Sequence, residues 1–393
     1  MGVITTGHQH SVPVDGGLMI STRAMQQVLI NAEQRTARVE AGVRWGQVVP
    51  KAAKAGLAPL NGSTGGVGVV GYTVGGGLSP TLGRALGYAD DHVTSLDVVT
   101  ADGQLRTATA TTEKDLFFAV RGGKSNFGIV TAVEFRLFPV QTLYAGNLFF
   151  PGELAKDVLN AYRTWVATVP EAMSSSVALM RIPPLPSAPE PLRGRFVVTV
   201  RIAYAGSALT GADLVKPLRA IGPMVLDTVT EIPYTDFASI HADPVDPVPA
   251  YERTALLREL SAATVDELVA VAGPGAAVPL TMVELRHLGG ALARPPAVPN
   301  AVSNRDAAFT LFTAGVGAPA DTAAITRQQD ELIRRMRPWS TGQTYLNFLS
   351  SADATAEQVR TAFIPETYNR LVQLKQQYDP TNMFRLNHNI KPA

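Results

Sequence analysis

The residues best suited to chemistry lie in a glycine-rich segment, Pro59 to Gly77, which reads PLNGSTGGVGVVGYTVGGG and carries no formal charge. Glycine is concentrated where the backbone must adopt positive φ or lie against a ligand, because it has no Cβ to clash. Successive backbone N–H groups form a concave site for anions, so the segment indicates a phosphate or pyrophosphate site. The alternative is a mobile linker rich in glycine and serine. This segment instead contains residues that favour burial, namely Val67, Val69, Val70, Tyr72 and Val74.

Gly66, Gly68 and Gly71 also form a literal GxGxxG pattern, and Asp91 follows at the spacing of a nicotinamide-dinucleotide fingerprint. That fingerprint requires a strand before it and a helix after it. The preceding residues are rich in turn formers, and the following residues include a second glycine cluster that would break a helix. We therefore keep the phosphate site and reject a Rossmann fold.

Polar residues also share faces in two predicted strands. Glu284 and Arg286 point to one face of a strand over 279–288 and His287 to the other, since side chains alternate along a strand. If this face covers the ligand bound at the glycine segment, Glu284 is a candidate base and Arg286 a source of positive charge. The alternative is a solvated sheet face.

Tyr345 and Asn347 are two residues apart in a predicted strand over 342–350, so they share a face. A phenol with the ordinary pKa of about 10 is a poor base at pH 7, and nearby positive charge must lower its pKa for it to act. The alternative is a core tyrosine with a satisfied hydroxyl.

Composition excludes several classes of function. The 393 residues allow two or three domains, and the net charge of +1 predicts no nucleic-acid partner. Cysteine is absent, which excludes disulfides, thiolate metal sites and cysteine nucleophiles. We predict no metal site. No apolar run approaches the roughly 20 residues of a membrane helix, and the first residues lack a secretory signal, so we expect a cytoplasmic protein with no membrane partner. The oligomeric state does not follow from the sequence.

The elements that must position these residues fall into three blocks. Residues 1–140 contain strands and turns, 141–340 alternate helices and strands with proline-rich loops between them, and 341–393 contain a strand, one or two helices and an extended tail. Period-two alternation or turn signals predict strands at 17–30, 35–41, 92–100, 104–110, 129–139, 195–204, 279–288, 308–316 and 342–350. Helices are predicted at 45–55, 153–169, 322–337 and 355–377.

The motifs, taken in order, resemble the berberine bridge enzyme-like family of FAD-linked oxidases. They are TGH (6–8), DGGLMIST (15–22), RTARVEAGVRWGQV (35–48), the glycine segment, VVTADG (98–103), DLFFAVRGGKSNFGIVTAVEFRLFPV (115–140), VELRHLGGA (283–291) and YDPTNMFRLNHNI (378–390). The resemblance implies an α+β fold with a split FAD-binding domain of the PCMH, or vanillyl-alcohol-oxidase, type. Residues 1–140 form its first part, 341–393 return to it, and 141–340 form an inserted substrate domain of mixed or antiparallel sheet covered by helices.

The resemblance also implies which residues bind FAD. His8, after Gly7, occupies the position of covalent attachment to the flavin, with His10 as the rival; a surface histidine without a role is the other alternative. A second, cysteinyl link is impossible without cysteine. For Asn126 the alternative is a turn residue, and for the tail asparagines it is satisfaction of their own loop. The other implied cofactor residues are Asn61, Gly62, Ser63, Thr64, Gly65, Gly66, Val67, Gly68, Gly71, Gly75, Gly76, Gly77, Asn126, Gly128, Val130, Asn347, Asn387 and Asn389.

The implied activity is hydride transfer from an alcohol or C–H bond of a sugar-like or secondary-metabolite substrate to FAD, and then electron transfer to O₂. Tyr345 looks like the family's base, with Glu284 and Arg286 as further catalytic candidates. Two alternatives remain, a non-catalytic scaffold with or without flavin and a dehydrogenase that uses another acceptor. In the family a strand–helix–strand unit precedes TGH, and almost all of it is missing here. We therefore expect that the sequence starts late.

Overall fold

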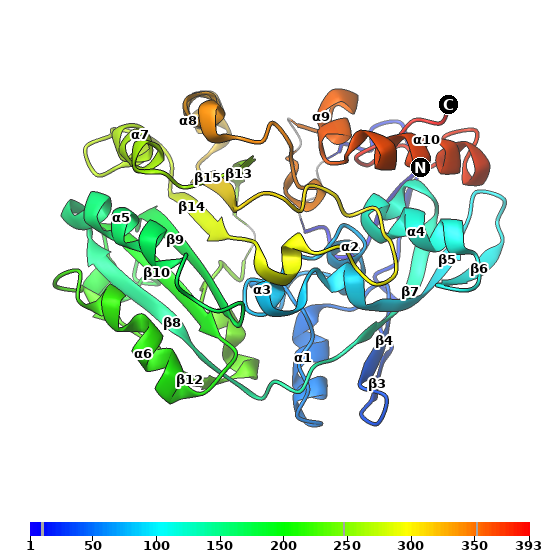
Figure 1. The fold of residues 1–393 in the computed structure, drawn as a ribbon. Coiled ribbons are helices and arrows are strands. Elements are labelled where there is room, and N and C mark those ends of the chain that lie inside the picture. The colour runs from blue at the N-terminus through cyan, green and yellow to red at the C-terminus, as the bar shows by residue number, and fades with distance from the viewer. Residues whose placement is uncertain (9–11, 247, 351–352) are drawn as a thin grey trace.

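The computed structural model describes residues 1–8, 12–246, 248–350 and 353–393. It has two halves, each built on an antiparallel sheet. Two short helices of the region around the glycine segment, α2 (Val69–Thr73) and α3 (Gly83–Leu86), lie between the halves (Figure 1). The predicted α+β class is confirmed. Most of the cofactor residues expected from the sequence therefore lie in loops and short helices, and Glu284 and Arg286 lie on a strand of the second sheet.

The first half contains a five-stranded sheet of order β3-β4-β7-β5-β6. Val39, Val133 and Leu96 lie opposite one another on three neighbouring strands and are fully buried, which explains why these segments form strands. The strands predicted over 35–41, 92–100, 104–110 and 129–139 are confirmed. The elements of this half are β3 (Val28–Asn31), β4 (Thr36–Glu40), α1 (Trp45–Ala53), β5 (Val93–Val99), β6 (Leu105–Thr109), α4 (Lys114–Gly123) and β7 (Ile129–Arg136).

The second half contains an eight-stranded sheet of order β11-β8-β10-β9-β14-β15-β13, with β12 also paired to β8. One face is apolar: Val200, Val177, Leu285 and Leu311 form a row across β10, β9, β14 and β15. They pack in one core with residues of four helices, which cover that face (Figure 1). The elements are β8 (Thr142–Pro151), α5 (Ala155–Trp165), β9 (Met173–Arg181), β10 (Phe196–Tyr204), α6 (Ala208–Arg219), β11 (Leu226–Asp227), β12 (Thr230–Pro233), β13 (Ala250–Leu257), α7 (Ala262–Ala272), β14 (Met282–His287), β15 (Phe309–Val316) and α8 (Thr322–Met336).

The C-terminal segment returns to the first half. Helices α9 (Ala356–Thr361) and α10 (Pro365–Tyr378) confirm the prediction over 355–377, and Leu371 and Ile390 share a core with Leu96 and Val133. The strand predicted at 342–350 is wrong, because Leu346–Phe348 form a 3₁₀ turn between the extended residues Tyr345 and Leu349. The turn is held by the side-chain amide of Asn347, which donates to the carbonyl of Tyr72 over 2.8 Å.

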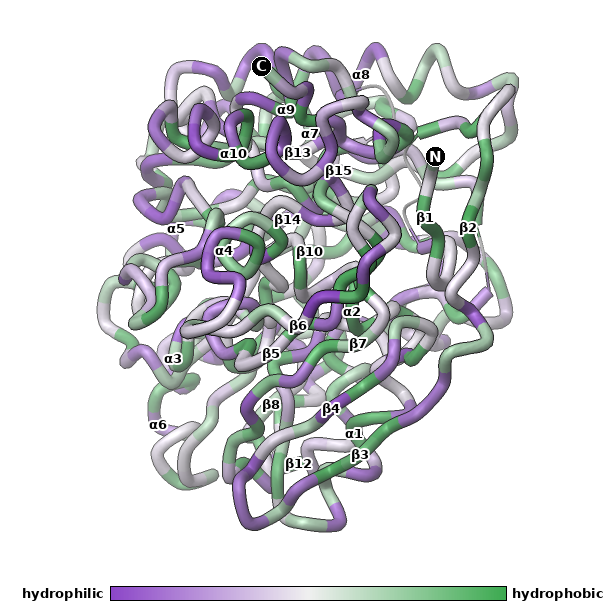
Figure 2. Tube along the Cα trace, turned by 90° about the vertical axis from the view of Figure 1, so that its right-hand side faces the viewer, coloured by the Kyte–Doolittle hydropathy of each residue, from purple (hydrophilic) through white to green (hydrophobic). Residues whose placement is uncertain are grey.

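The N-terminal residues form a separate two-stranded parallel pair, β1 (Gly2–Ile4) with β2 (Met19–Ser21). The two strands lie side by side near the N-terminus (Figure 2), and the backbone N–H of Thr22 donates to the carbonyl of Ile4. This pair sets the position of the TGH residues that follow β1. Within the described ranges, no helix is long and apolar enough to cross a membrane.

Candidate active site

The TGH turn lies against the glycine segment. A Cβ atom on Gly68 would be 3.0 Å from Thr6 Cγ2, and one on Gly71 would be 3.9 Å from Thr5 Oγ1. Gly7 has a φ of 78°, in the left-handed region that glycine tolerates without strain. The fold therefore places His8 next to the segment predicted to bind phosphate.

His8 is exposed at the surface, yet the surrounding chain lowers its pKa by desolvation. Asp243 raises this pKa and Arg44 lowers it. Arg44 Nη1 also donates to the carbonyl of Gly66 over 2.8 Å, so His8, Arg44 and the glycine loop form one neighbourhood. A lowered pKa keeps the imidazole neutral at pH 7, the form that acts as a nucleophile. The rival, His10, lies outside the described residues.

Several glycines of the segment are explained by close packing within the protein. A Cβ on Gly62 would lie 3.2 Å from the Tyr72 ring, and one on Gly65 would lie 3.2 Å from Gly46 Cα. Gly77 has a φ of 72° and would place a Cβ 2.6 Å from Ala89 Cβ. These three glycines are needed for the fold whether or not a cofactor is bound.

Gly66 and Gly71 differ, because both are exposed and no atom outside the immediate chain comes closer than 3.7 Å to a Cβ built there. Around them, Ser63 donates its hydroxyl to Asp243, Thr64 Oγ1 accepts from the N–H of Gly66, and the carbonyl of Val67 accepts from the N–H of Trp45. The open backbone beside the TGH turn is therefore at Gly66 and Gly71.

The second glycine cluster contacts the predicted Tyr-x-Asn pair directly. A Cβ on Gly76 would lie 2.8 Å from Tyr345 Oη, and one on Gly75 would lie 2.0 Å from Asn347 Oδ1. The same Cβ on Gly75 would lie 2.4 Å from Lys124 Cε. Tyr345, Asn347 and Lys124 therefore meet on a glycine ridge at 75–76 where no larger residue fits.

Lys124 was not singled out by the sequence. Its backbone has a φ of 56°, and burial lowers the pKa of its ammonium group to about 8. Its positive charge helps to hold the pKa of the buried His388 down to about 3. On either side of His388, the Oδ1 atoms of Asn387 and Asn389 are buried without a hydrogen-bond partner among the described residues.

Other predicted cofactor residues are engaged by the protein. The amide of Asn61 donates to the carbonyl of Gly62 and accepts from the Tyr234 hydroxyl, both over 2.8 Å. The amide of Asn126 donates to the carbonyl of His388 over 3.0 Å and accepts from the N–H of Ile390 over 2.8 Å, so it fastens the C-terminal tail.

Gly128 and Val130, which follow Asn126 in the chain, also have a role in packing. A Cβ on Gly128 would lie 2.6 Å from the carbonyl oxygen of Val99, and Val130 is buried in the core of the five-stranded sheet. The positive φ expected of a left-handed turn occurs at Lys124 rather than at Asn126. This second glycine turn therefore joins the sheet to the tail.

The Tyr345 phenol is buried beside the Tyr88 and Phe348 rings, with centroids 5.8 and 5.2 Å away. Burial raises its pKa well above the ordinary value, and contacts with Asn347 and the backbone of Leu78 lower it in part. Its oxygen makes no hydrogen bond of good geometry within the described chain. The phenol is thus neutral at pH 7 and available to a ligand.

Glu284 lies at the centre of a buried charged cluster. Its Oε1 accepts from Arg201 Nη1 and from the Ser176 hydroxyl, each over 2.6 Å, and its Oε2 accepts from Arg286 Nε over 2.8 Å. Burial raises the pKa of Glu284, but Arg286 and Arg201 together hold it well below the ordinary value. A carboxylate held in this way is a weak proton acceptor. Arg286, paired with it, stacks over the Phe312 and Phe348 rings.

The structure brings further residues to this place. Arg201 lies inside the largely apolar stretch RFVVTVRIAY, and a charge inside a buried strand was a usable signal. Ser174 and Ser176 come from a run of three serines that carried no such signal. Within the described ranges, no group of three acidic or histidine side chains could hold a metal ion.

The residues present fit a flavin cofactor. Exposed glycine backbone at Gly66 and Gly71 adjoins a nucleophilic histidine, and buried polar atoms of Tyr345, Asn387 and Asn389 have no hydrogen-bond partner in the described chain. A group with many polar edges would satisfy such atoms, which otherwise cost about 1–3 kcal/mol each. Gly66, Gly71, His8 and Lys124 are the residues that would hold it.

Comparison with known proteins agrees with this site. The family profile described as "FAD binding domain" matches residues 2–109, and the one described as "Berberine and berberine like" matches residues 344–391. An FAD-linked oxidoreductase of Dictyostelium discoideum is 26% identical over 99% of this chain and 83% of that protein. (R)-6-hydroxynicotine oxidase of Paenarthrobacter nicotinovorans is 28% identical over 96% of this chain and 82% of that protein.

The solved structure of a xylooligosaccharide oxidase from Myceliophthora thermophila superposes with a TM-score of 0.84 at 22% identity, and covers 100% of this chain and 86% of that one. The FAD-binding profile and the curated relatives define an FAD-linked oxidoreductase, and the solved structures share its PCMH-type α+β fold. The chain carries the FAD-binding and berberine-like profiles of the berberine bridge enzyme-like family, and its relatives include FAD-linked oxidoreductases, as the sequence motifs predicted.

Proposed function

We propose that this protein oxidises an alcohol or C–H bond of a small molecule at the junction of the glycine ridge and the eight-stranded sheet. FAD, when bound, supplies the hydride acceptor and passes the electrons on to O₂. The observation that carries the proposal is the Tyr345 oxygen, which is buried on Gly76 without a well-formed hydrogen bond. In this position it can accept the proton of a substrate hydroxyl as the hydride leaves carbon.

Tyr345 accepts a proton only as a phenolate. Because burial raises its pKa well above the ordinary value, the phenolate is scarce at pH 7, and its fraction grows about tenfold for each pH unit below the pKa. Substrate oxidation should therefore accelerate with pH. Removing a general base costs roughly 10²–10⁴-fold in rate.

We further propose that the flavin is attached covalently to His8. The support is the neutral imidazole beside the exposed glycines. Only a single attachment is available in this chain, because it contains no cysteine. Denatured, acid-washed protein should keep its yellow colour, with the adduct on a peptide containing His8. Complete loss of colour, with unchanged cofactor content in His8→Ala, would contradict the attachment.

The names of related proteins guide the choice of compounds for a substrate screen. Related proteins are named for the oxidation of 6-hydroxynicotine and of xylooligosaccharides, so sugars and secondary metabolites form the first panel to screen. Each compound is mixed with flavin-loaded protein without oxygen, and bleaching of the flavin marks a substrate. Absence of bound flavin would favour the scaffold alternative.

With a substrate in hand, Tyr345→Phe is compared with the parent protein from pH 6 to 10. We expect flavin reduction to slow by the factor given above and to lose its rise with pH. An unchanged anaerobic rate would exclude Tyr345 as the base. Oxygen uptake then tests the acceptor, since reduced flavin that reoxidises slowly in air but rapidly with a quinone dye identifies a dehydrogenase.

A further inference from the structure

The sheet face opposite the helices carries a continuous polar row. Asn147, Arg201, Ser176, Arg286 and Thr310 occupy directly opposite positions on the five neighbouring strands β8, β10, β9, β14 and β15. Side chains at opposed positions of antiparallel strands point to the same face. All except Arg286 are at least nine-tenths buried. Five adjacent strands that each place a polar residue in one buried row indicate a binding surface.

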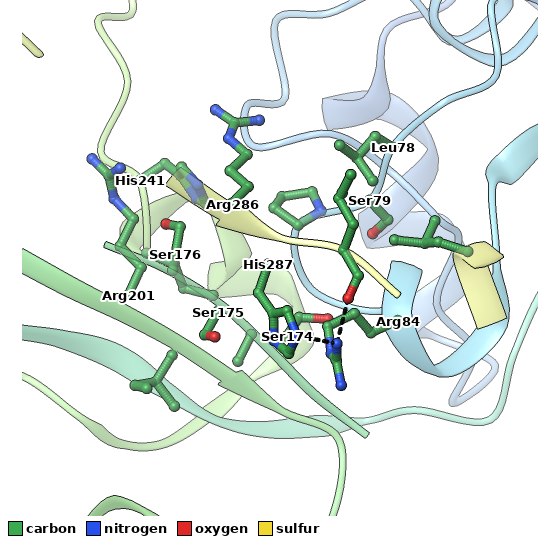
Figure 3. A pocket seen from close by; sticks show the side chains of 16 residues that line it. Leu78, Ser79, Arg84, Ser174, Ser175, Ser176, Arg201, His241, Arg286 and His287 are labelled. Atoms are coloured by element: carbon green, nitrogen blue, oxygen red, sulfur yellow. Dashed lines mark hydrogen bonds between the residues drawn. The ribbon is translucent and has the colours of Figure 1, made fainter. Parts of the chain in front are cut away.

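Part of this row lines a pocket closed by the first half of the molecule. Arg201, Ser176 and Arg286 form one wall with Ser174, and Arg84 and the residues after the glycine segment form the other (Figure 3). The cavity volume is about 20 Å³. A water molecule needs at least about 10–15 Å³ by this measure, so the pocket admits a small polar group and not a whole substrate.

The lining carries more positive than negative charge. Arg84, Arg201 and Arg286 contribute three guanidinium groups to the lining. Glu284, which lies outside the lining, supplies the carboxylate that pairs with Arg201 and Arg286. Arg84 bonds to carbonyl oxygens of Met173 and Leu288 and to a ring nitrogen of His287, none of which is an anion.

The two histidines of the lining add no further positive charge. Burial lowers the pKa of both His241 and His287, so both rings are neutral at pH 7. Nearby acidic groups act from outside the lining: Asp243 and Glu252 raise the pKa of Arg286, and Glu171 raises that of Arg84. Asp243 accepts a hydrogen bond from Ser63, and Glu171 pairs with Arg294.

Five polar atoms on the pocket wall are buried without a hydrogen-bond partner among the described residues: Ser174 Oγ, Arg201 Nε, His241 Nδ1 and Nε2, and His287 Nδ1. An arginine N–H only donates, and hydroxyl or neutral imidazole groups can donate as well. Each unsatisfied buried group is costly. A ligand that accepts hydrogen bonds and carries negative charge would satisfy both the donors and the excess charge.

We propose that this pocket binds a carboxylate, and that the substrate is a carboxylic acid in its anionic form. The carboxylate site is inferred from the lining of the pocket alone. The identification of its ligand as the substrate rests on the proposed function. A planar carboxylate offers two oxygens that accept several bonds and pairs well with guanidinium groups. A tetrahedral phosphate is bulkier, and the small cavity favours the carboxylate.

The experiment compares acetate with acetamide on the flavin-loaded protein, because they have nearly the same shape and differ in charge. For ligands this small, dissociation constants in the millimolar range are expected. Saturation-transfer NMR titrations at constant ionic strength, read on the methyl protons, give the affinities of acetate and acetamide. Competition of inorganic phosphate against the acetate signal gives the third affinity. We expect acetate to bind at least about tenfold more tightly than acetamide, a difference of about 1.4 kcal/mol, and more tightly than phosphate.

Two variants locate the site. Arg201→Gln should reduce the preference for acetate to near unity, and Ser174→Ala should weaken acetate binding while the fold is unchanged, because that hydroxyl has no partner to lose. Ser95→Ala, on β5 of the other sheet, is the matched control. If Arg201→Gln fails to fold, Ser174→Ala still tests the pocket.

Equal affinities for acetate and acetamide, tighter binding of phosphate, no detectable acetate binding, or a preference unaffected by both variants would each overturn the inference. The assay measures binding without turnover, so its result tests the carboxylate site separately from the proposed oxidation. A protein that oxidises neutral compounds yet shows no preference for acetate refutes only the carboxylate site. A preference for acetate in a protein that never reduces flavin refutes only the oxidase.

Discussion

At the scale of single residues, the site is marked by ionisable groups whose pKa values are shifted by burial and by neighbouring charges. Glu284 is kept ionised by two arginines, Lys124 is an ammonium group whose pKa burial lowers to about 8, and Tyr345 is a phenol whose pKa burial raises. Groups with shifted pKa values gather at functional sites more often than elsewhere. Each of these three makes a measurable contribution to stability or rate.

Replacing Glu284 by Gln should strongly destabilise the protein. The substitution leaves Arg201 and Arg286 side by side without their shared carboxylate, and breaking a buried ion pair in this way costs about 3–5 kcal/mol. Urea unfolding followed by circular dichroism measures the loss. The matched control is Glu331→Gln, which removes the exposed partner of Arg334 on α8 and should change little. Equal effects of the two substitutions would contradict the buried cluster.

Lys124 should make stability depend on pH in the alkaline range. Its pKa is about 8 in the folded protein and 10.5 ordinarily, so the unfolded chain binds more protons between these values. Stability therefore rises with pH across that window. In flavin-free protein, Lys124→Met should have the higher Tm at pH 7, and the gap should narrow between pH 8 and 10. Lys156→Met, at an exposed ion pair, is the control, and a gap independent of pH would refute the assignment.

At the scale of elements, the glycine ridge and the turn at Leu346–Phe348 are complementary surfaces. Gly75 and Gly76 have no side chains, and Tyr345 and Asn347 occupy the space that side chains would fill. The ridge is also held by backbone hydrogen bonds, in which the N–H of Asp90 donates to the carbonyl of Gly76 and the N–H of Gly122 donates to the carbonyl of Val74. The turn therefore packs against a ridge that the first half already positions.

Gly76→Ala should cost more than backbone strain alone. Its φ is 112°, and the new Cβ would lie 2.8 Å from Tyr345 Oη. Gly103→Ala is the matched control, since φ is 78° there and nothing lies within 4 Å; left-handed strain costs roughly 1–2 kcal/mol. We expect Gly76→Ala to lower the Tm of thermal unfolding by more than Gly103→Ala does. Combining it with Tyr345→Phe should recover part of the loss, and strict additivity would show that the two residues do not touch.

At the scale of the whole molecule, the C-terminal segment joins the inserted half back to the first half. Lys375 donates to Asp379 and to the carbonyls of Asn126 and Phe384, all buried, and the Asn126 amide binds the tail at His388 and Ile390. These bonds hold Asn387 and Asn389 near Lys124. The last residues of the chain are thus fastened to the first half of the molecule.

Asn126→Ala should release the tail. Two hydrogen bonds to the tail backbone are lost, and we expect faster hydrogen exchange over 385–393 and a lower flavin content, with smaller changes elsewhere. Asn160→Ala, which removes an exposed bond to a helix carbonyl, serves as the control. Unchanged exchange in the tail would mean that core contacts of Ile390, rather than Asn126, hold it.

The sequence by itself determined the class of fold, the family and most regular elements. Strands such as 195–204 and 308–316 and helices such as 322–337 follow from periodic burial, which is local information. It also placed TGH, the glycine segment and the Tyr-x-Asn pair in a cofactor region, through resemblance of motifs. Those residues lie far apart in the chain, and their proximity is a property of the fold.

Only the tertiary structure decided what each polar residue contacts. The strand predicted at 342–350 became a turn because Asn347 bonds to Tyr72 in another segment. The amide of Asn126 binds the tail, and Glu284 is paired with Arg201, a partner on another strand. The cationic pocket likewise exists only where β9, β10 and β14 meet the residues after the glycine segment. The physical reason is that hydrogen bonds, desolvation and charge pairing depend on distance in space, and separation along the chain does not specify that distance.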